Sequence, residues 1–253
     1  MAEGDTILRA ARRIEAAVGG QRLLVAGSNR GRAARVERLD GSNLDRVETR
    51  GKHLLLHFGD LVLHSHLGMS GSWQIYRRGE RWRKPASTAW VTLGAEKMEA
   101  VQFGGPTLRV LGASQLRRDP TLARLGPDIL APDFDDAGAI QALRSVPSLE
   151  LGEALLDQRL IAGIGNIFKS EACFLAKSSP WRPVAEYSDD ELREVLTAAR
   201  RLMQESVAAG RSDPAVYRRS GHPCPACGTP IAARGQGDAN RRTYWCPRCQ
   251  RDI

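Results

Sequence analysis

The spacing of apolar residues near the start of the chain predicts an amphipathic helix over residues 5–18. The residues that would form its buried face recur every three or four positions: Ile7, Ala11, Ile14 and Val18. Asp5 is placed to cap this helix, because a short acidic side chain can accept a hydrogen bond from the first unpaired backbone N–H groups. Gly19 and Gly20 follow the last apolar position and are expected to end it.

Short patterns typical of β-strands replace the helical pattern between residues 22 and 125. The segments KHLLLHF (52–58) and LVLHSHLGM (61–69) flank Gly59-Asp60, a pair typical of a two-residue hairpin turn. The segments STAWVTL and TLRVL follow, with turn residues between them. This half of the chain therefore predicts an antiparallel β sandwich or barrel preceded by one helix.

Helical patterns return in the second half of the chain. The segment LGPDILAPDFDD (125–136) is rich in proline and aspartate, and it is expected to link the two halves. Residues 148–180 then read as a helix, a glycine turn and a second helix. Ser188 and Glu191 have the spacing of a capping box, and they predict a further helix that ends at Gly210. We therefore expect a separate helical domain.

The composition is that of a globular protein, with 42% hydrophobic and 26% charged residues. The net charge of +8 favours a polyanionic partner, either nucleic acid or a membrane surface, because basic side chains attract phosphate groups. No apolar run approaches the roughly 20 residues needed to cross a bilayer. Glu3 and Asp5 stand where a secretory signal would be basic and then apolar. We expect a cytoplasmic protein with no membrane partner.

Four of the five cysteines form two C-x2-C pairs separated by 18 residues: Cys224, Cys227, Cys246 and Cys249. This arrangement predicts a tetrahedral site for one structural Zn²⁺ ion, whereas a redox dithiol would need only one pair. Cys173 lies in an apolar helical pattern and is expected to be a core residue. Residues 217–253 also hold seven arginines against two aspartates, so the zinc ribbon is either a nucleic-acid reader or a purely structural unit.

Three other features permit more than one interpretation. The segment GIGN (163–166) can bring backbone N–H groups close to a phosphate, with Asn166 capping the next helix, but a simple packing turn has the same residues. Lys52 opens the predicted hairpin, a place where most lysines are only solvated charges. His64 and His66 share one face of a strand, which suggests either metal ligands or partly buried sheet residues.

The first six residues, MAEGDT, raise a further possibility. Removal of Met1 is usual when the second residue is small, and it would leave a free amine on Ala2, beside Glu3. This is either an unstructured start or the reactive end of an enzyme. The residues alone leave both interpretations open.

Several motifs taken in order resemble bacterial DNA glycosylases of the formamidopyrimidine-DNA glycosylase/endonuclease VIII family. They are M-x-E-G at the start, RGKHLLL, HLGMSGSW, LGPD, LLDQRLIAGIGNIFKSE and a four-cysteine segment ending in CQR. Together they cover nearly the whole chain. The resemblance implies an α+β multidomain fold with four parts: an N-terminal helix plus antiparallel β sandwich (1–124), a linker (125–136), a helix–two-turn–helix domain (137–216) and a zinc finger (217–253).

The resemblance also implies DNA base-excision repair, with the damaged base flipped out of the stack. The Ala2 amine would form a Schiff base with the sugar, Glu3 would transfer protons, and Lys52 would be the catalytic lysine of the hairpin. The same enzyme would then cleave the abasic site by β,δ-elimination. Three residues are expected to contact the DNA: Met69 in the gap left by the flipped base, Asn166 at a phosphate, and Arg241 on the finger.

The chain departs from the family where Ala2 replaces the usual proline. We expect retained chemistry, and the alternative is a catalytically impaired protein that only binds damaged DNA. MxEGDT and the missing DPRRFG loop around residues 100–112 favour the endonuclease VIII branch, which removes oxidised pyrimidines, although HLGMSGSW resembles the purine-lesion branch. The expected partner is damaged DNA, bound by a monomer in the cytoplasm at the nucleoid.

Overall fold

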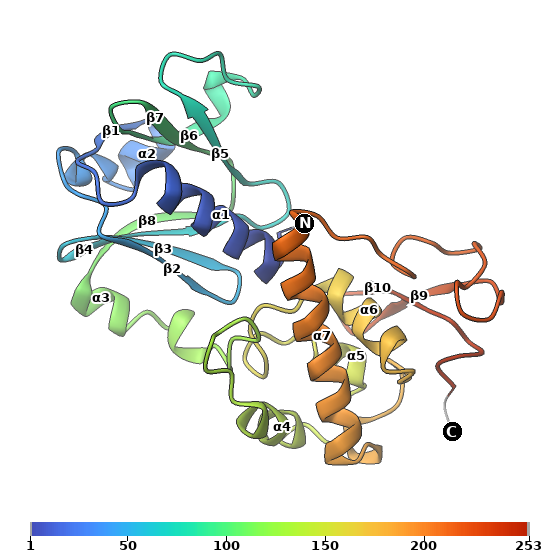
Figure 1. The fold of residues 1–253 in the computed structure, drawn as a ribbon. Helices are drawn as coiled ribbons and strands as arrows, with labels where there is room; N and C mark the ends of the chain where they lie inside the picture. Colours follow the sequence, from blue (N-terminus) through green and yellow to red (C-terminus); the bar gives the residue numbers. More distant parts are fainter. Residues whose placement is uncertain (1, 252–253) are drawn as a thin grey trace. The chain divides into compact units, whose positions relative to one another are not determined.

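The computed structural model describes residues 2–251, and its contacts divide the chain into two units after Arg124. Eight strands of the first unit form its framework (Figure 1): β1 (Leu24–Gly27), β2 (Arg46–Arg50), β3 (His53–Phe58), β4 (Leu61–His66), β5 (Ser72–Arg77), β6 (Ala89–Gly94), β7 (Met98–Phe103) and β8 (Thr107–Gly112). Its helices are α1 (Gly4–Val18), α2 (Asn29–Ala33) and α3 (Ala113–Arg117), with 3₁₀ turns η1 (Val36–Leu39), η2 (Ala86–Thr88) and η3 (Leu122–Arg124).

The strands of the first unit form two four-stranded sheets, in the orders β1-β6-β7-β5 and β2-β3-β4-β8, and every neighbouring pair is antiparallel. Leu54, Leu56 and Leu63 of the second sheet share one core with Val91 and Leu93 of the first. Helix α1 packs on strands of both sheets and contributes its apolar face to the same core (Figure 1). The expected β sandwich preceded by a helix is confirmed.

Helix α1 has the predicted buried face, since Ile7, Ala11, Ile14 and Val18 are all buried. The prediction that Asp5 caps it is wrong. The N-cap residue is Glu3, and the helix begins at Gly4, so Asp5 lies in the first turn and forms an ion pair with Arg9 at 3.1 Å. A carboxylate in the first turn still stabilises the helix through its dipole.

The predicted hairpin is confirmed, with Phe58 paired to Leu61 across Gly59-Asp60. Gly59 adopts a φ of 55°, a left-handed conformation that glycine reaches without a steric penalty. The strands β3 and β4 therefore lie side by side in full register from His53–His66 to this turn.

The second unit is helical and ends in a short hairpin: α4 (Asp136–Arg144), α5 (Leu151–Ala154), α6 (Asn166–Leu175), η4 (Val184–Glu186), α7 (Asp189–Ala209), β9 (Ala232–Gln236) and β10 (Arg241–Trp245). Helices α4, α6 and α7 share a core that also buries Ile129 completely. The segment 125–136, expected as a linker, thus packs into this unit. The further division at residue 216 stays a prediction.

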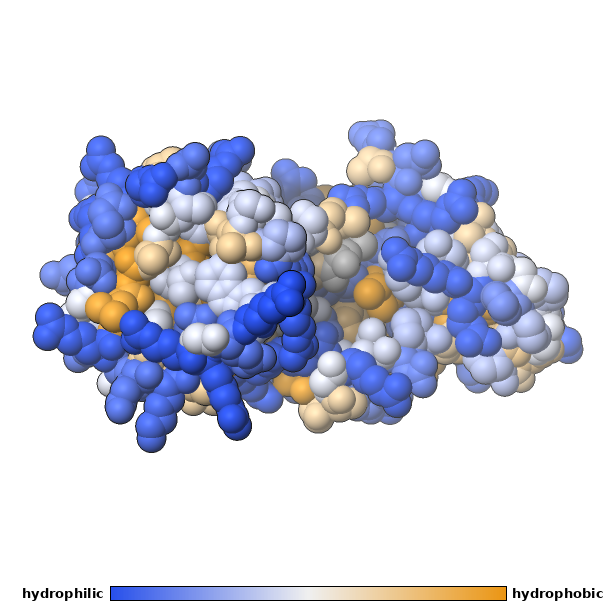
Figure 2. Space-filling model, turned by 90° about the horizontal axis from the view of Figure 1, so that it is seen from above, coloured by the Kyte–Doolittle hydropathy of each residue, from blue (hydrophilic) through white to orange (hydrophobic). Residues whose placement is uncertain are grey.

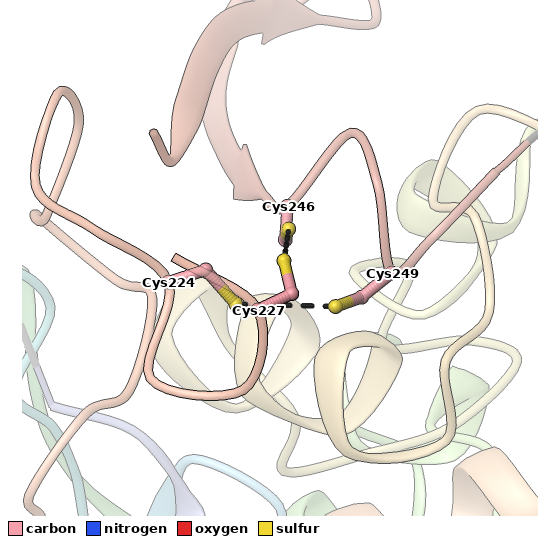
Figure 3. A group of neighbouring side chains, drawn as sticks. All are labelled: Cys224, Cys227, Cys246 and Cys249. Carbon is pink, nitrogen blue, oxygen red and sulfur yellow. Dashed lines mark hydrogen bonds between the residues drawn. The ribbon is translucent and has the colours of Figure 1, made fainter. Parts of the chain in front are cut away.

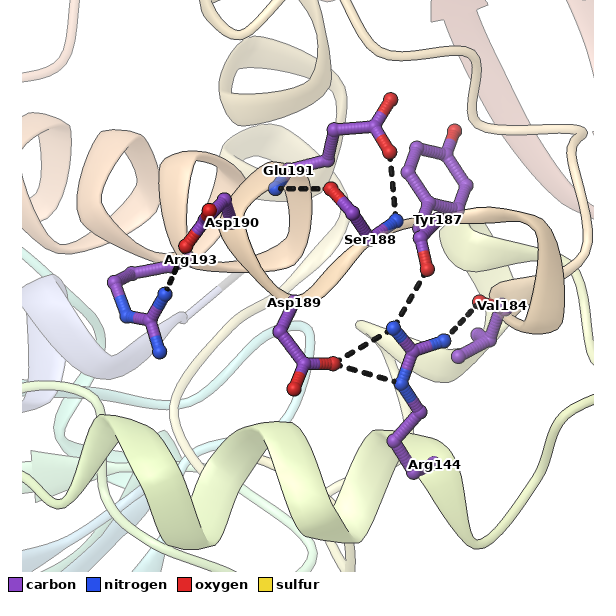
Figure 4. A network of polar contacts seen from close by, with 8 residues as sticks. All are labelled: Arg144, Val184, Tyr187, Ser188, Asp189, Asp190, Glu191 and Arg193. Carbon is purple, nitrogen blue, oxygen red and sulfur yellow. Dashed lines mark hydrogen bonds and ion pairs between the residues drawn. The ribbon is translucent and has the colours of Figure 1, made fainter.

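The start of α7 shows how the sequence sets a helix boundary (Figure 4). Ser188 Oγ accepts from the Glu191 backbone N–H at 3.2 Å, and the Glu191 carboxylate accepts from the Ser188 N–H at 2.7 Å, which confirms the capping box. Arg144 of α4 donates to Asp189 at 2.7 Å and to the carbonyl of Val184 at 2.9 Å. This arginine therefore holds α4 against the start of α7. No helix within residues 2–251 has the length and apolar character to span a membrane.

Candidate functional site

The start of the chain is anchored at one end of the β2-β3-β4-β8 sheet. The backbone nitrogen of Ala2 donates to the carbonyl of Gly68, just beyond β4, at 3.2 Å. Glu3 follows as the N-cap of α1 and is completely buried. The first residues are therefore built into the first unit, and the interpretation as an unstructured start is excluded.

Lys52 lies at the same end of this sheet. Arg50 pairs with His53, so Gly51 and Lys52 form the two-residue turn between β2 and β3. His53 in turn pairs with His66, two residues before Gly68. The strand register therefore brings the Lys52 turn to the sheet end where Ala2 and Glu3 lie.

Met69 follows Gly68 on the turn between β4 and β5, and its side chain is 65% exposed. This turn packs closely against the β7–β8 turn. A Cβ on Gly71 would meet the Cα of Gly105 at 2.9 Å, and Gly105 itself has a φ of 113°. Glycine is needed at both positions because the two backbones touch and because Gly105 has a conformation that other residues rarely adopt.

Two of the expected DNA contacts come together in the second unit. Asn166 is the first residue of α6, and its side-chain Nδ2 donates to the carbonyl of Arg242 in β10 at 2.8 Å. Arg241, the neighbouring residue, is exposed at the start of β10. The structure therefore places Asn166 beside the basic end of the hairpin, although contact of either residue with DNA stays a prediction.

The prediction that Asn166 caps α6 through its side chain is wrong. Gly165 is the N-cap residue, and no side chain caps this helix. The Oδ1 atom of Asn166 is buried and has no hydrogen-bond partner in the described part of the chain. A buried acceptor without a partner is uncommon, so Asn166 retains unused hydrogen-bonding capacity at the positive end of the α6 dipole.

The four cysteines of the two C-x2-C pairs meet at the base of the β9–β10 hairpin (Figure 3). Their Sγ atoms all lie within 4.8 Å of one another, with Cys224–Cys249 at 3.9 Å and Cys227–Cys246 at 3.5 Å. Four sulfurs about 2.3 Å from a tetrahedral zinc ion are about 3.8 Å apart. The site therefore fits one Zn²⁺ ion, and four protein ligands leave no position for a reacting water.

The electrostatics of these thiols also fit a cation. Burial, together with hydrogen bonds to the other three cysteines, raises the pKa of Cys249 to about 12. Hydrogen bonds from Thr229 lower the pKa of Cys227 to about 6. The thiols cannot all lose their protons at neutral pH by themselves, because each thiolate repels the next, and a divalent ion supplies the missing charge.

Cys173 is completely buried in α6, as predicted for a core residue, and burial raises its pKa to about 12. His64 and His66 are not part of a metal site. Among residues 2–251, only the four cysteines form a group that could hold a metal ion. His64 instead contacts His53 and Arg109, two residues that sequence reasoning missed. The only signal for them was the occurrence of polar residues within otherwise apolar strands.

The chain matches three family descriptions in order. Residues 1–107 match the formamidopyrimidine-DNA glycosylase N-terminal domain, residues 125–216 the formamidopyrimidine-DNA glycosylase H2TH domain, and residues 221–251 the zinc finger found in FPG and IleRS. These matches cover most of the sequence. The chain therefore belongs to the formamidopyrimidine-DNA glycosylase/endonuclease VIII family.

Relatives within the family match this chain over nearly its whole length. The "Probable endonuclease 8 2" of Streptomyces coelicolor is 42% identical, over 99% of this chain and 94% of its own. The "DNA-(apurinic or apyrimidinic site) lyase Nei2" of Mycolicibacterium smegmatis is 35% identical, over 99% of each chain. The fold matches Lactococcus lactis Fpg in complex with abasic-site DNA, with a TM-score of 0.85, 22% identity, and coverage of 99% of this chain and 100% of that one.

Proposed function

We propose that this chain is a bifunctional DNA glycosylase of base-excision repair, which removes an oxidised base and then cleaves the strand at the abasic site. Its family supports this, as do full-length relatives named endonuclease 8 and abasic-site lyase. The observation that carries the proposal is the position of Ala2. Its nitrogen is held by Gly68 at 3.2 Å, next to the buried Glu3 and at the sheet end that carries Lys52.

The chemistry begins when removal of Met1 makes the Ala2 nitrogen a free amine. An α-amine has a pKa of about 7.7–8.0, against about 10.4 for a lysine, so a useful fraction is neutral near pH 7.5. The neutral amine attacks C1′ of the sugar, the bond from C1′ to the base breaks, and the base leaves with a proton. Loss of a proton from nitrogen and opening of the sugar ring then give the iminium, a Schiff base.

Glu3 acts as the proton donor and acceptor in these steps. Its carboxyl group delivers a proton to the ring oxygen O4′ as the C1′–O4′ bond opens. The iminium acidifies C2′, so that loss of a C2′ proton expels the 3′ phosphate, and a second elimination expels the 5′ phosphate. The ammonium of Lys52 supplies positive charge beside these departing phosphates. The zinc ion, when bound, stabilises the finger and takes no part in these steps.

The DNA contacts follow from the same architecture. Met69 is exposed on a tight turn next to the Ala2 anchor, so its side chain can fill the space that a flipped nucleotide leaves in the stack. Asn166, at the positive N-terminal end of α6, binds a backbone phosphate. Arg241 is exposed on the finger hairpin and contacts phosphate as well.

We further propose a preference for oxidised pyrimidines. The β7–β8 turn is Gly104-Gly105-Pro106, which is too short to project a loop with long side chains towards the base. The full-length relatives that support this preference carry the endonuclease 8 name, although relatives named formamidopyrimidine-DNA glycosylase also match, at 32–37% identity.

The protein is proposed to act as a monomer in the cytoplasm, at the nucleoid. Within the described residues, only three large hydrophobic side chains are well exposed: Leu24, Met69 and Leu175. Figure 2 shows one face of the molecule, on which long hydrophilic side chains dominate. Such a surface offers little apolar area for a stable dimer. Light scattering at micromolar concentration tests this, and a mass of twice 27.7 kDa would overturn it.

The test of the activity is a substrate panel treated with borohydride, which reduces a Schiff base to a stable adduct. Duplexes carry an oxidised pyrimidine, an oxidised purine or an abasic site, and the variant Ala2→Pro is the matched control. The proposal predicts strand cleavage and a covalent adduct for both proteins, with the oxidised pyrimidine cleaved faster than the purine. Tight binding of damaged duplex without any adduct would instead identify an impaired protein that only binds damage.

A further inference from the structure

Polar side chains cross one face of the β2-β3-β4-β8 sheet, on the strands that adjoin the Lys52 turn. His53 and His64 are buried there, whereas the Arg109 side chain is 43% exposed. His53 pairs with His66, and His64 pairs with Arg109, so these four side chains lie on one face. The alternate residues of the same strands face the opposite core. His53 is 9% exposed and His64 only 1%. The chemistry proposed above uses neither.

The side chains form a continuous hydrogen-bonded chain that starts at Asp119. Its Oδ1 accepts from the backbone N–H groups of Thr121 and Leu122, each at 3.1 Å. Its Oδ2 accepts from Arg109 Nη2 at 2.7 Å. The same Arg109 nitrogen lies 2.9 Å from His64 Nδ1. The two hydrogens of one guanidinium nitrogen therefore serve Asp119 and His64.

The chain continues from His64 towards the catalytic end of the sheet. His53 Nδ1 lies 2.9 Å from the Nε2 atom of His64. The ring of His53 is also 4.7 Å from the ring of His66, measured between centroids. Besides burial, the positive charge of Lys52 lowers the pKa of His66. A series of contacts thus runs from Asp119 to His53 and His66, and His53 is the residue that follows Lys52.

The arginine determines which nitrogen of each histidine carries the proton. A guanidinium can only donate, so His64 Nδ1 must be an acceptor, and its single proton is on Nε2. His64 Nε2–H then donates to His53 Nδ1, which must be an acceptor as well. His53 is therefore neutral, with its proton on Nε2. One fixed donor at Arg109 sets the tautomers of both rings.

Burial, and to a smaller extent the neighbouring groups, keep the rings neutral. Burial is the main reason that the pKa of His53 falls to about 3, and proximity to the basic groups His66, His64 and Arg109 lowers it further, against Asp119. Burial and Arg109 lower the pKa of His64 to about 4, also against Asp119. Burial and then Lys52 lower the pKa of His66. Asp119 stays charged, since hydrogen bonds from Leu122 and Arg109 outweigh the effect of burial on its pKa.

The end of this series opposite Asp119 adjoins the two turns that carry the reaction. His53 directly follows Lys52, and His66 lies two residues before Gly68, which holds the Ala2 nitrogen. We propose that Arg109, Asp119 and His64 are positioning residues, which lock His53 as the neutral Nε2–H tautomer and so fix the Lys52 turn relative to the terminal amine. This inference rests on the proposed function, because it concerns the same amine and lysine.

The first test reads the tautomers directly and needs no activity. Long-range ¹⁵N–¹H correlation spectra distinguish protonated from unprotonated ring nitrogens, and the chain has only five histidines to assign. The wild-type protein is expected to show His53 and His64 with a protonated Nε2 and an unprotonated Nδ1. Single His53→Gln and His64→Gln variants assign the signals. A protonated Nδ1 on either residue would overturn the proposal.

The second test measures whether the hydrogen bonds from Arg109 that set the tautomers affect the cleavage rate. Arg109→Met paired with Asp119→Asn removes the donor without leaving a buried carboxylate unpaired, and the amide oxygen introduced by the second substitution would still accept from the backbone of η3. Single-turnover cleavage of abasic-site duplex at saturating enzyme is expected to slow about tenfold or more, because small displacements of reacting groups are costly. Affinity for uncleavable abasic duplex is expected to change less than about twofold, since none of the proposed DNA contacts is altered and the two substitutions together leave the net charge unchanged.

Two controls separate positioning from stability. Arg12→Gln removes an exposed arginine of α1 and is expected to leave both rate and tautomers unchanged. Arg109→Lys keeps a positively charged group that can only donate, and is expected to keep the tautomers and most of the rate. The positioning role alone would be overturned if the double variant showed mixed tautomers but cleaved at the wild-type rate. It would also be overturned if Arg109→Lys kept the wild-type tautomers but cleaved slowly. An active site that forms no Schiff base in the wild-type protein would overturn the proposed function instead.

Discussion

Lys169 of α6 is completely buried, and its ammonium group donates a hydrogen bond to the Thr243 hydroxyl of β10. The Thr243 hydroxyl in turn donates to Gln236 Oε1 of β9 at 2.6 Å. A buried lysine is costly unless its donors are satisfied. This contact therefore fixes the hairpin of the finger against the helix whose first residue is Asn166, and it holds the two expected phosphate-binding elements in one orientation.

Arg241→Ala tests the DNA contact of that hairpin. Loss of one phosphate contact is expected to weaken binding to any duplex and to reduce the slope of log Kd against log salt by about 1. Fluorescence anisotropy over a series of salt concentrations measures both. Arg211→Ala removes another exposed arginine of the same unit and serves as the control. An unchanged slope in Arg241→Ala would remove this residue from the phosphate contacts.

Removal of zinc is expected to release the finger from the rest of the second unit. Trp245 precedes Cys246 and packs edge-on against Trp181, with ring centroids 4.9 Å apart, so tryptophan emission reports the loss of this contact. Cys246→Ser, or chelation of the wild-type protein, should change this emission and weaken DNA binding by at least about tenfold, because metal binding supplies folding free energy. Cys173→Ala should keep one zinc ion per chain. Full DNA affinity without zinc would contradict the structural role.

Acid should destabilise the first unit through His53 and His64. Both have a pKa in the folded protein, of about 3 and about 4, that lies below the unfolded value of 6.5. Below pH 6.5 the unfolded chain therefore binds more protons than the folded chain, so the free energy of unfolding decreases as pH falls from about 6.5 towards 4. Thermal unfolding at several pH values measures this. The double variant His53→Gln/His64→Gln should show a weaker dependence, and an equal dependence in both proteins would contradict the assignment.

Glu3→Gln should separate the two chemical activities. Base excision is expected to be abolished, while cleavage of a preformed abasic site is retained to a greater extent, because an abasic sugar already opens in solution and needs less help from the acid. Excision and abasic-site cleavage are measured on matched duplexes. Glu96→Gln, which changes an exposed glutamate of the same unit, is the control. Equal loss of both activities would argue against a role for Glu3 in opening the sugar ring.

Local patterns in the sequence predicted those parts of the structure that depend on local spacing. The apolar face of α1, the β3–β4 turn and the capping box of Ser188 and Glu191 are all confirmed, because each follows from residues a few positions apart. The grouping of the four cysteines around one metal site was predicted for the same reason, because zinc coordination requires their spacing. The helix caps that were assigned to Asp5 and Asn166 were wrong by only one or two residues, because the N-caps are Glu3 and Gly165.

Relations that depend on tertiary pairing could not be predicted. Strand β7 (MEAVQF) has no clean alternation and becomes a strand because it pairs with β5 on one side and β6 on the other. The contact of His53 with His64 needs the exact register of β3 and β4, and the contact with Arg109 needs β8 as well. The position of Lys52 beside Gly68 depends on the same register. The family motifs predicted the catalytic residues without showing which contacts hold them in place.

The central claim is that the nitrogen of Ala2 bonds to the sugar of the damaged nucleotide. The most direct test is mass spectrometry of the borohydride-trapped adduct with abasic-site DNA, after digestion to peptides. The account predicts that Met1 is absent and that the DNA fragment is attached to the amine of Ala2 in the N-terminal peptide. An adduct on Lys52 or any other lysine, or an active protein that retains Met1, would contradict it.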